Sequence, residues 1–367
     1  MHTFESLLDY RELNSLYRAT PSIQDYYFTS NFHTPLARDV DSDTVEQISI
    51  TATTTPGPGN ARGGAARRIA PKGATKRFFQ LFHYFTQMDL PADCLRALRE
   101  PESFALMEKG KQIVELQQEE MAIKLRLFKE VVLSQVLSTG VVNLDVNGNI
   151  LTPSVNSSTG VVTDASGTVI SASFGVDDGN RGNVGSIIDA LWSTASTKIS
   201  KHLDEIVRDA ATNGAPRPRR VYVNGVKKYF LRNNTEFNDW AKYNGPVDKI
   251  LAGEMIPGLW GFDWYFVDGT WTDSTGTTRD LIPQTRAIIM PEPGPWLRAH
   301  NGSEMVPSSM VPAGTVSELV NQLDKVYGEF TFASMSYNPV TLSAFYGDNF
   351  GLNFADPNAI YMPTVFS

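Results

Sequence analysis

The sequence predicts an α+β protein with one very long helix, an extended hairpin and several separate strands. Residues 104–137 contain no proline and keep apolar side chains on one helical face, which predicts a helix of roughly 45–50 Å. Residues 44–55 and 75–85 are rich in β-branched or aromatic residues and predict two strands joined by a long loop. The C-terminal residues 328–366 alternate as strand, turn and strand. Helices and strands therefore occupy separate stretches of the chain.

The composition excludes several classes of protein. The 367 residues carry 32 basic and 40 acidic side chains, and the net charge of −8 argues against a general nucleic-acid-binding surface. The single cysteine, Cys94, rules out an intramolecular disulfide and a cysteine-based zinc site. No apolar run approaches the ~20 residues of a membrane span, and the N-terminus lacks the basic region of a signal peptide. These features predict a protein of the cytoplasm that does not contact a membrane.

The N-terminal residues predict a helix followed by an aromatic stretch. Residues 4–18 form an amphipathic pattern that Pro21 ends. Residues 22–36 contain Tyr26, Tyr27, Phe28 and Phe32 without clear periodicity. Two interpretations of this stretch remain open, namely a loop on the chain's own core and an arm on a neighbouring subunit.

The loop between the first two strands is long and basic. Residues 56–74 are rich in Gly and Pro, and no acid occurs between Glu46 and Asp89. Loops of this length are uncommon in compact domains unless they have a function or lack order. One interpretation is a flexible solvated tip. The more specific interpretation is an arm that lies on the acidic surface of a neighbouring subunit. A nucleic-acid arm is less favoured because the tip lacks aromatic residues. The candidate contact residues are Arg62, Arg67, Arg68, Lys72, Lys76 and Arg77.

The long helix has clear signals at both ends. Ser103 can cap its first turn, and Gly140 can end it. A short helix with Cys94 is predicted before it, at residues 91–99. After it, Asn147-Gly148 and Ser166-Gly167 predict hairpin turns in a Ser/Thr-rich β flap at residues 141–175.

The second half of the chain predicts a mixture of short elements. Helices are expected at residues 187–192, 196–212, 235–240 and 316–326. Strands are expected at 220–223, 259–268 and 286–291, with a hairpin tip at 269–280 and a surface loop at 292–312.

The residues that could take part in catalysis do not form a recognisable catalytic pattern. The five histidines are far apart in the sequence, and no G-x-S-x-G or phosphate-binding glycine motif occurs. No catalytic residue, metal site or cofactor is therefore predicted. Four tryptophans could line a ligand pocket, although aromatic residues on strands more often belong to a core or an interface: Trp260, Trp264, Trp271 and Trp296.

Three stretches carry a resemblance to a known family. Residues 218–233 read PRRVYVNGVKKYFLRN, and residues 258–291 place an aromatic strand, a polar hairpin and Ile282-Pro283 before a further strand. The ending contains Asn338-Pro339 and Asp356-Pro357-Asn358-Ala359. With the order of the parts, these stretches resemble the lambda-type major capsid protein E family of tailed bacteriophages, which has the Hong Kong 97-like capsid fold.

The resemblance implies the following division of the chain. An N-terminal arm (1–36) precedes an E-loop with its flanking strands (37–90) and a peripheral domain (91–187) that contains the spine helix and the β flap. An axial domain (188–325) and C-terminal strands that return to the peripheral domain (326–367) complete the subunit. The β flap and the long basic tip look like local insertions.

The resemblance also implies a function. The chain would be a major capsid protein that self-assembles into hexamers and pentamers of an icosahedral shell around double-stranded DNA. The implied partners are other copies, a scaffolding protein, a portal, a decoration protein and non-specifically packaged DNA. The implied location is the virion capsid, with assembly in the host cytoplasm. Two alternatives stay open: an encapsulin-like nanocompartment shell, and an enzyme with a dispersed active site.

Overall fold

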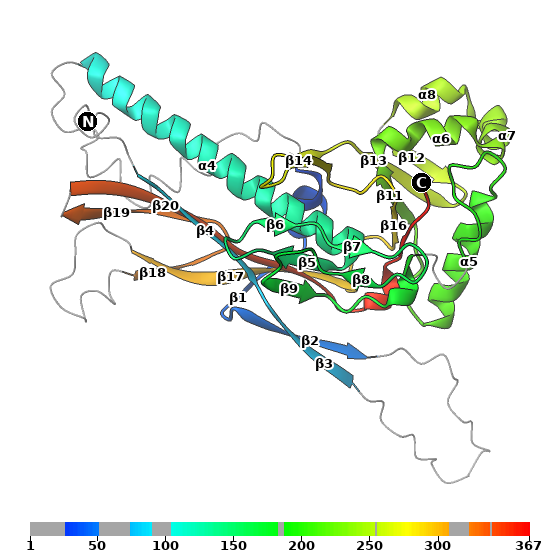
Figure 1. Ribbon diagram of the computed structural model, residues 1–367, viewed down its shortest axis with the longest axis horizontal. Helices are drawn as coiled ribbons and strands as arrows, with labels where there is room; N and C mark the ends of the chain where they lie inside the picture. The colour runs from blue at the N-terminus through cyan, green and yellow to red at the C-terminus, as the bar shows by residue number, and fades with distance from the viewer. Residues whose placement is uncertain are drawn as a thin grey trace, which may run out of the picture. The chain divides into compact units, whose positions relative to one another are not determined.

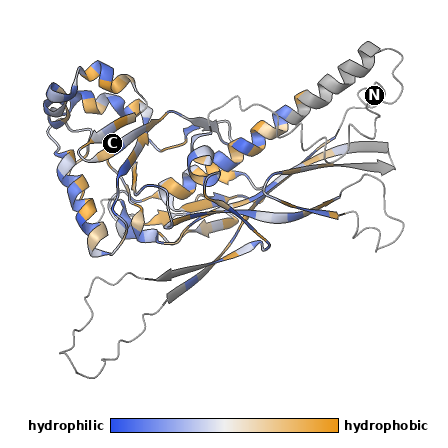
Figure 2. Cartoon of the chain, turned by 180° about the vertical axis from the view of Figure 1, so that it is seen from behind, coloured by the Kyte–Doolittle hydropathy of each residue, from blue (hydrophilic) through white to orange (hydrophobic). Residues whose placement is uncertain are grey.

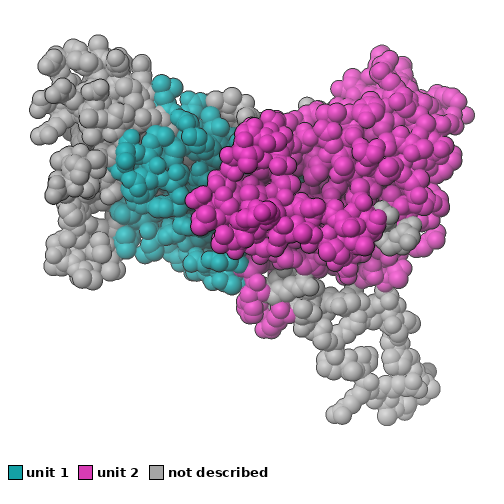
Figure 3. Space-filling view, in the orientation of Figure 1, with its two compact units in different colours: residues 1–45, 80–130, 299–351 teal, residues 46–79, 131–298, 352–367 magenta. Residues whose placement is uncertain are grey.

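The computed structural model describes residues 26–50, 74–89, 104–182, 187–253, 255–307, 323–337 and 340–367. The chain divides into two compact units (Figure 3). Unit 1 holds residues 1–45, 80–130 and 299–351, and unit 2 holds residues 46–79, 131–298 and 352–367. The helix α4 (Phe104–Thr139) contributes residues to both units.

Unit 1 is built on a six-stranded sheet with the strand order β1-β17-β20-β19 (Figure 1). Strand β18 pairs with β17, and β4 pairs with β20. The middle of α4 packs on this sheet, because Met121 and Ala122 form one buried cluster with Ala344 and Tyr346. The elements are the short π-helix η1 (Thr29–His33), β1 (Ala37–Val40), β4 (Phe82–Asp89), β17 (Leu297–Pro307), β18 (Leu323–Tyr327), β19 (Phe330–Tyr337) and β20 (Val340–Phe354).

The residues around η1 pack on their own chain. Phe28 and Phe32 are fully buried, and their rings lie 6.1 Å apart. Of the two interpretations of the aromatic stretch, the burial supports the chain's own core for the described residues 26–36.

Two predictions for the last third of the sequence were wrong. The expected loop at 292–312 contains β17, which pairs in parallel with β1 and antiparallel with β18. The prolines before Trp296 suggested a loop, whereas the strand begins directly after them and its partners are distant in the sequence. Residues 323–326, expected as the end of a helix, belong to β18 (Leu323–Tyr327), because pairing with β17 outweighs the local helical pattern. Residues 308–322 lie outside the described part.

The hairpin prediction needs one correction. β2 (Thr44–Ile50) pairs with β3 (Ala74–Gln80), as expected, but the second predicted strand is divided at Leu81. The Leu81 N–H donates to Asp43 O at 2.8 Å, and its side chain is buried. Because β4 then pairs with β20, residues 74–80 and 82–89 have different partners.

Unit 2 holds a four-stranded sheet with the order β12-β13-β11-β16. β11 pairs in parallel with β13 and antiparallel with β16. The strands are β11 (Arg220–Asn224), β12 (Met255–Leu259), β13 (Phe262–Val267) and β16 (Ala287–Met290), and β14 (Thr270–Thr272) and β15 (Thr278–Asp280) form the predicted hairpin. The helical segments are α5 (Ile199–Thr212), η3 (Gly225–Lys227), α6 (Lys228–Asn233), α7 (Thr235–Asn244) and α8 (Val247–Ala252).

The helix α5 shows how local pattern and tertiary packing agree. Ile199, Leu203, Ile206 and Ala210 are buried in the core of unit 2, as their spacing predicts. Figure 2 shows hydrophilic and hydrophobic residues alternating around this helix. Gly214 follows it with φ +68°, which is the left-handed conformation expected at a helix end.

Two other predictions for unit 2 need correction. The strand expected at 259–268 is confirmed at β13, but its first residues belong to the end of β12 and to a turn at Trp260 and Gly261, both with positive φ. Apolar residues run through this turn and hide it from the sequence pattern. Residues 187–192 form turns rather than a helix, and Trp192 instead donates its backbone N–H to Val365 O.

The flap of unit 2 follows α4 directly. Its strands are β5 (Val141–Leu144), β6 (Ile150–Leu151), β7 (Ser154–Val155), β8 (Val162–Thr163) and β9 (Ile170–Ser173). Gly148, with φ +77°, turns β5 into β6 as expected. The turn at Ser166-Gly167 exists, but β9 pairs with β5 and β8 pairs with β7, so it joins strands of two small sheets. The η2 turn (Asp178–Asn180) leads into β10 (Arg181–Gly182), which pairs with β21 (Met362–Pro363), and η4 (Pro357–Ala359) precedes β21.

The predicted long helix is confirmed from Phe104 to Thr139, and Gly140 follows it with φ +68°. From Lys129 onward its residues are all buried, whereas Leu116, nearer the start of the helix, is exposed. Among the described residues, no helix combines the length and apolar character needed to cross a bilayer. The predicted helices at 4–18 and 91–99 and the cap at Ser103 lie outside the described residues.

Candidate assembly site

The predicted contact residues belong to the hairpin of β2 and β3. Within the described part of the chain, these two strands pair only with each other. Lys76 and Arg77 lie on β3. The other four predicted contact residues lie outside the described residues: Arg62, Arg67, Arg68 and Lys72.

Lys76 has a partner within the chain. Its Nζ lies 2.7 Å from Glu46 Oε1, and the two side chains are 61% and 40% exposed. Ion pairs this exposed contribute about 0–1 kcal/mol, so the contact leaves Lys76 available for exchange with another carboxylate. Phe78, also on β3, is 68% exposed and adds an aromatic side chain to the same ribbon.

A buried ion pair lies in unit 1. Lys129 Nζ, on α4, is 2.9 Å from Asp348 Oδ2 on β20, and both side chains are at most 5% exposed. Lys129 also lies over the ring of Phe350, 5.1 Å from its centroid. Burial raises the pKa of Asp348, and Lys129 opposes this rise. Burial also lowers the pKa of the neighbouring His33, with Lys129 as the second cause.

Glu130, which follows Lys129 on α4, accepts hydrogen bonds from the N-terminal segment of unit 1. Glu130 Oε1 accepts from Phe28 N at 2.6 Å, and Oε2 accepts from Thr29 N and Oγ1, both at 2.8 Å. Glu130 is 1% exposed. Its carboxylate therefore satisfies backbone donors at the start of η1 and fastens residues 26–36 to α4.

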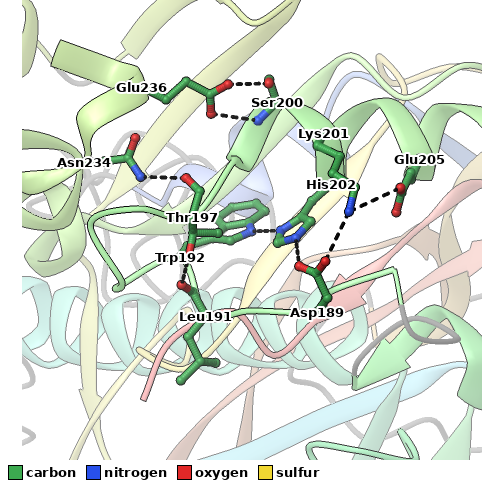
Figure 4. Close-up of polar contacts among 10 residues, drawn as sticks. All are labelled: Asp189, Leu191, Trp192, Thr197, Ser200, Lys201, His202, Glu205, Asn234 and Glu236. Atoms are coloured by element: carbon green, nitrogen blue, oxygen red, sulfur yellow. Dashed lines mark hydrogen bonds and ion pairs between the residues drawn. The ribbon is translucent and has the colours of Figure 1, made fainter. Parts of the chain in front are cut away.

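A hydrogen-bonded histidine lies in the core of unit 2 (Figure 4). Trp192 Nε1 donates to His202 Nδ1 at 3.1 Å, and His202 Nε2 lies 2.6 Å from Asp189 Oδ1. Because the indole can only donate, Nδ1 is the acceptor and Nε2 carries the proton. The hydrogen bond from His202 is the main cause that lowers the pKa of Asp189.

This histidine–aspartate pair is arranged for structure. In a hydrolase, a nucleophile would occupy the position that the Trp192 indole holds. The nearby Ser200 hydroxyl bonds instead to Glu236, as Figure 4 shows. Asn234 Nδ2 donates to Thr197 O, and Thr197 Oγ1 donates to Leu191 O, so these contacts join residues 189–197 to α5 and α7.

Two buried guanidinium groups lie near the end of α4 in unit 2. Arg286 Nη1 donates to Ser138 O at 3.0 Å, where the partial negative charge of the helix C-terminus favours a cation. Burial lowers the pKa of Arg286 to about 10, and Arg181 contributes to the shift. Arg181 in turn pairs with Asp178 at 2.8 Å. Sequence periodicity gives no signal for these contacts, because both residues sit in short turns or strand ends.

A small cavity of about 260 Å³ opens beside the same helix end in unit 2. Its lining includes Val131, Ser134 and Gln135 of α4, together with Trp271, Arg279 and Leu281. Of the four tryptophans considered for a pocket, only Trp271 is at this cavity. Trp264 and Trp296 are buried, and Trp296 stacks on Phe354, which supports the core interpretation for those two.

One family model matches most of the chain, and solved structures are similar to it in fold. The family model of phage major capsid protein E matches residues 10–303. No curated protein matches the chain. A solved structure of the putative capsid protein of a prophage from E. coli CFT073 is similar over 98% of this chain and 99% of that one, with a TM-score of 0.56 and 9% identity.

Two further solved structures show lower similarity. The mature capsid of bacteriophage PhiM1 has a TM-score of 0.47 at 11% identity, covering 94% of this chain and 88% of that one. The SrpI encapsulin of Synechococcus elongatus PCC 7942 has a TM-score of 0.47 at 8% identity, covering 95% and 91%.

The prophage protein supports the fold alone, since its identity is low, and confirms the expected Hong Kong 97-like capsid fold. The family match covers most of the sequence and includes residues 218–233 and 258–291, which carried the resemblance. The chain therefore belongs to the phage major capsid protein E family, and it is a structural protein of a bacteriophage capsid.

Proposed function

We propose that this capsid protein forms hexamers and pentamers of an icosahedral shell, and that the basic tip of its hairpin holds neighbouring copies together. The observation that carries this proposal is the strand pairing of the β2–β3 ribbon. Within the described residues its strands pair only with each other, and the stretch from residue 47 to 88 contains bases and no acid. A ribbon whose strands pair with no other strand of the described chain suits contact with another copy, although Phe79 of β3 lies 6.0 Å from the ring of Phe174.

The remaining assignments follow from the same role. Residues 1–36 act as the arm, 37–90 as the E-loop, 91–187 as the peripheral domain and 188–325 as the axial domain, and residues 326–367 return to the peripheral domain. The shell encloses double-stranded DNA without sequence preference. A scaffolding protein directs assembly in the host cytoplasm, and a portal and a decoration protein complete the particle. The protein contributes structure rather than catalysis.

The test is a charge deletion in the tip. Arg62, Arg67 and Arg68 are replaced by Ser, and particle formation is followed by negative-stain microscopy and sedimentation. We expect the yield of shells to fall at least tenfold while the far-UV circular dichroism of the protomer stays unchanged.

A matched control removes the same charge elsewhere. Lys198, Arg208 and Arg217 are exposed residues of unit 2, and their replacement by Ser should leave shell yield within twofold of the parent. Equal loss of shells in both variants would contradict a specific role for the tip. Small stable oligomers of the unmodified chain under all conditions would contradict a shell role altogether, and nuclease-protected DNA separates a virus shell from an enzyme compartment.

A further inference from the structure

The cavity of about 260 Å³ in unit 2 has the size of a binding site for a small molecule. It is lined by the C-terminal end of α4, by Thr152 and Pro153 of the flap and by the β14–β15 hairpin. In Figure 1, β14 lies beside the C-terminal part of α4. Pockets for drug-sized ligands measure roughly 300–1,000 Å³, so this cavity suits a molecule of about one ring. The proposed shell assembly makes no use of it.

One polar atom at the cavity has no partner among the described residues. Gln135 of α4 lines the cavity and is 6% exposed. Its Nε2 donates to Leu151 O at 3.1 Å, which fixes the amide, whereas Oε1 accepts no hydrogen bond from the described part of the chain. A buried acceptor left without a donor costs about 1–3 kcal/mol. A ligand that offers an O–H or N–H group to Oε1 therefore gains affinity.

An aromatic ring also lines the cavity. Trp271 on β14 pairs with Arg279 on β15, and both residues contribute to the lining. An indole offers a flat apolar face that packs well against the C–H groups of a ring. Val131 and Leu281 add further apolar surface. The ligand therefore needs an apolar face as well as a hydrogen-bond donor.

Hydrogen bonds within the chain hold the lining residues in place. Ser134 Oγ donates to Leu281 O, which joins α4 to the residues after β15. Arg279 Nε donates to Asp273 Oδ2 at 2.7 Å, so the guanidinium at the cavity is oriented by a neighbour on the same hairpin. A site that is already ordered loses less conformational entropy when a ligand binds.

The charges around the cavity favour a neutral ligand. Arg279 and Asp280 both line it, and their charges balance. Ser138 also lines it, at the C-terminal end of α4, where the partial negative charge of the helix disfavours an anion. Arg286 donates to Ser138 O at 3.0 Å and brings a positive charge to the same place, which disfavours a cation. A phosphate of packaged DNA would meet the Asp280 carboxylate.

From these observations we infer that the cavity binds a pyranose sugar, either free or at the end of a glycan. A pyranose is neutral, its hydroxyl groups both donate and accept hydrogen bonds, and its C–H groups form an apolar face. The C–H face packs on Trp271, and one hydroxyl donates to Gln135 Oε1. Other hydroxyls bond to Arg279 and Asp280. A wholly apolar ligand leaves Gln135 Oε1 unpaired, and an ionic ligand meets a like charge.

Saturation-transfer NMR on the purified full-length chain tests the site. The probes are methyl α-D-glucopyranoside, methyl α-D-galactopyranoside and methyl α-D-mannopyranoside. We expect transfer to the ring C–H protons of at least one of them, with a millimolar dissociation constant because a single ring has few atoms to contribute. Trp271→Ala should weaken binding at least tenfold, and Trp271→Phe, which keeps a ring, less than threefold.

A matched control removes an aromatic ring elsewhere in unit 2. Tyr243 is 91% exposed and does not belong to the cavity lining, so Tyr243→Ala should bind the sugar as the parent does. Equal losses in Trp271→Ala and Tyr243→Ala overturn the site. Absence of saturation transfer to all three sugars overturns it as well.

A second variant tests the hydrogen bond. Gln135→Met keeps the size of the side chain and removes its acceptor, and we expect at least fivefold weaker binding. Unchanged binding in this variant contradicts the assigned contact. Thermal unfolding is measured for each variant, and if Gln135→Met does not fold, the Trp271 variants decide, because the other residues of that hairpin are largely exposed.

Beads coated with dextran, galactan or mannan distinguish the two sources of the sugar. Retention of the chain, with release by the matching methyl glycoside, shows that the site takes a glycan. Binding of the free glycoside without retention shows that it takes the free sugar. The site lies within one chain, so its failure leaves the proposed shell assembly standing, and failure of assembly leaves the sugar site standing.

Discussion

Lys129 Nζ donates a hydrogen bond to Asp348 Oδ2 at 2.9 Å, and residues 219 positions apart in the sequence thereby join α4 to β20 inside unit 1. Both charges are buried, so each depends on the other for its solvation. Among the described residues, Asp348 Oδ1 has no hydrogen-bond partner, which leaves half of the carboxylate uncompensated. The pair therefore joins two elements at a considerable desolvation cost.

Removal of one partner should be more harmful than removal of both. Asp348→Ala leaves the Lys129 ammonium buried without its carboxylate, and we expect the free energy of unfolding to fall by about 3–5 kcal/mol. The double variant Lys129→Met/Asp348→Leu removes both charges and should recover most of that loss. Urea unfolding of the protomer measures both variants. A double variant as unstable as the single one would show that packing, rather than charge, dominates.

The same carboxyl group predicts a pH dependence. Burial raises the pKa of Asp348 to about 6, compared with an ordinary value of 3.8. The folded state then binds this proton more tightly than the unfolded state, so protonation favours folding as the pH falls from 6 toward 3.8. The stability of the parent relative to Asp348→Asn should rise over that interval. A constant difference between the two proteins from pH 7 to pH 4 would contradict the raised pKa.

Glu130 should control the attachment of residues 26–36. Glu130→Ala leaves the N–H groups of Phe28 and Thr29 without their acceptor, and we expect a loss of about 2–3 kcal/mol with faster hydrogen exchange across this segment. Glu130→Gln keeps one acceptor oxygen and should cost less. Glu120→Ala is the control, because its carboxylate is 59% exposed and pairs only with Lys124 among the described contacts. Unchanged exchange at residues 26–36 in Glu130→Ala would contradict this role.

Two glycines of the flap region should differ sharply although both have positive φ. A Cβ at Gly160 would lie 2.1 Å from Asp178 O, whereas a Cβ at Gly167 meets nothing within 4 Å. Gly167→Ala should cost about 1–2 kcal/mol from backbone strain alone. Gly160→Ala adds a backbone clash and should cost about 1–3 kcal/mol more. Thermal unfolding compares the two, and similar melting temperatures would contradict the close approach at Gly160.

Much of the fold could be predicted where a pattern is local and uninterrupted. The bounds of α4 follow from its apolar spacing and from Gly140, and α5 follows from Ile199, Leu203 and Ala210. Turn residues such as Asn147-Gly148 located a hairpin for the same reason, since a positive φ is a property of one or two residues. The capsid family could also be predicted, because its motifs lie within single stretches.

Non-local pairing accounts for most of the wrong predictions. β17 and β18 were expected as a loop and a helix, and each is a strand because of partners far along the chain. Trp260 and Gly261 form a turn inside an aromatic run, so hydropathy alone shows one continuous strand. The contact residues proposed for the basic tip remain a prediction, with Lys76 in an exposed pair with Glu46.

By itself, the sequence determined the α+β class, the long helix, the basic hairpin tip and membership of a capsid family, because each is encoded in neighbouring residues. Only the tertiary structure decided that Lys129 and Glu130 are buried, that His202 accepts a hydrogen bond from Trp192, and that β9 pairs with β5. The physical reason is that burial and strand pairing depend on which distant segments come together. A charged residue on a helix looks solvated until its partner, here Asp348 or the start of η1, is placed beside it.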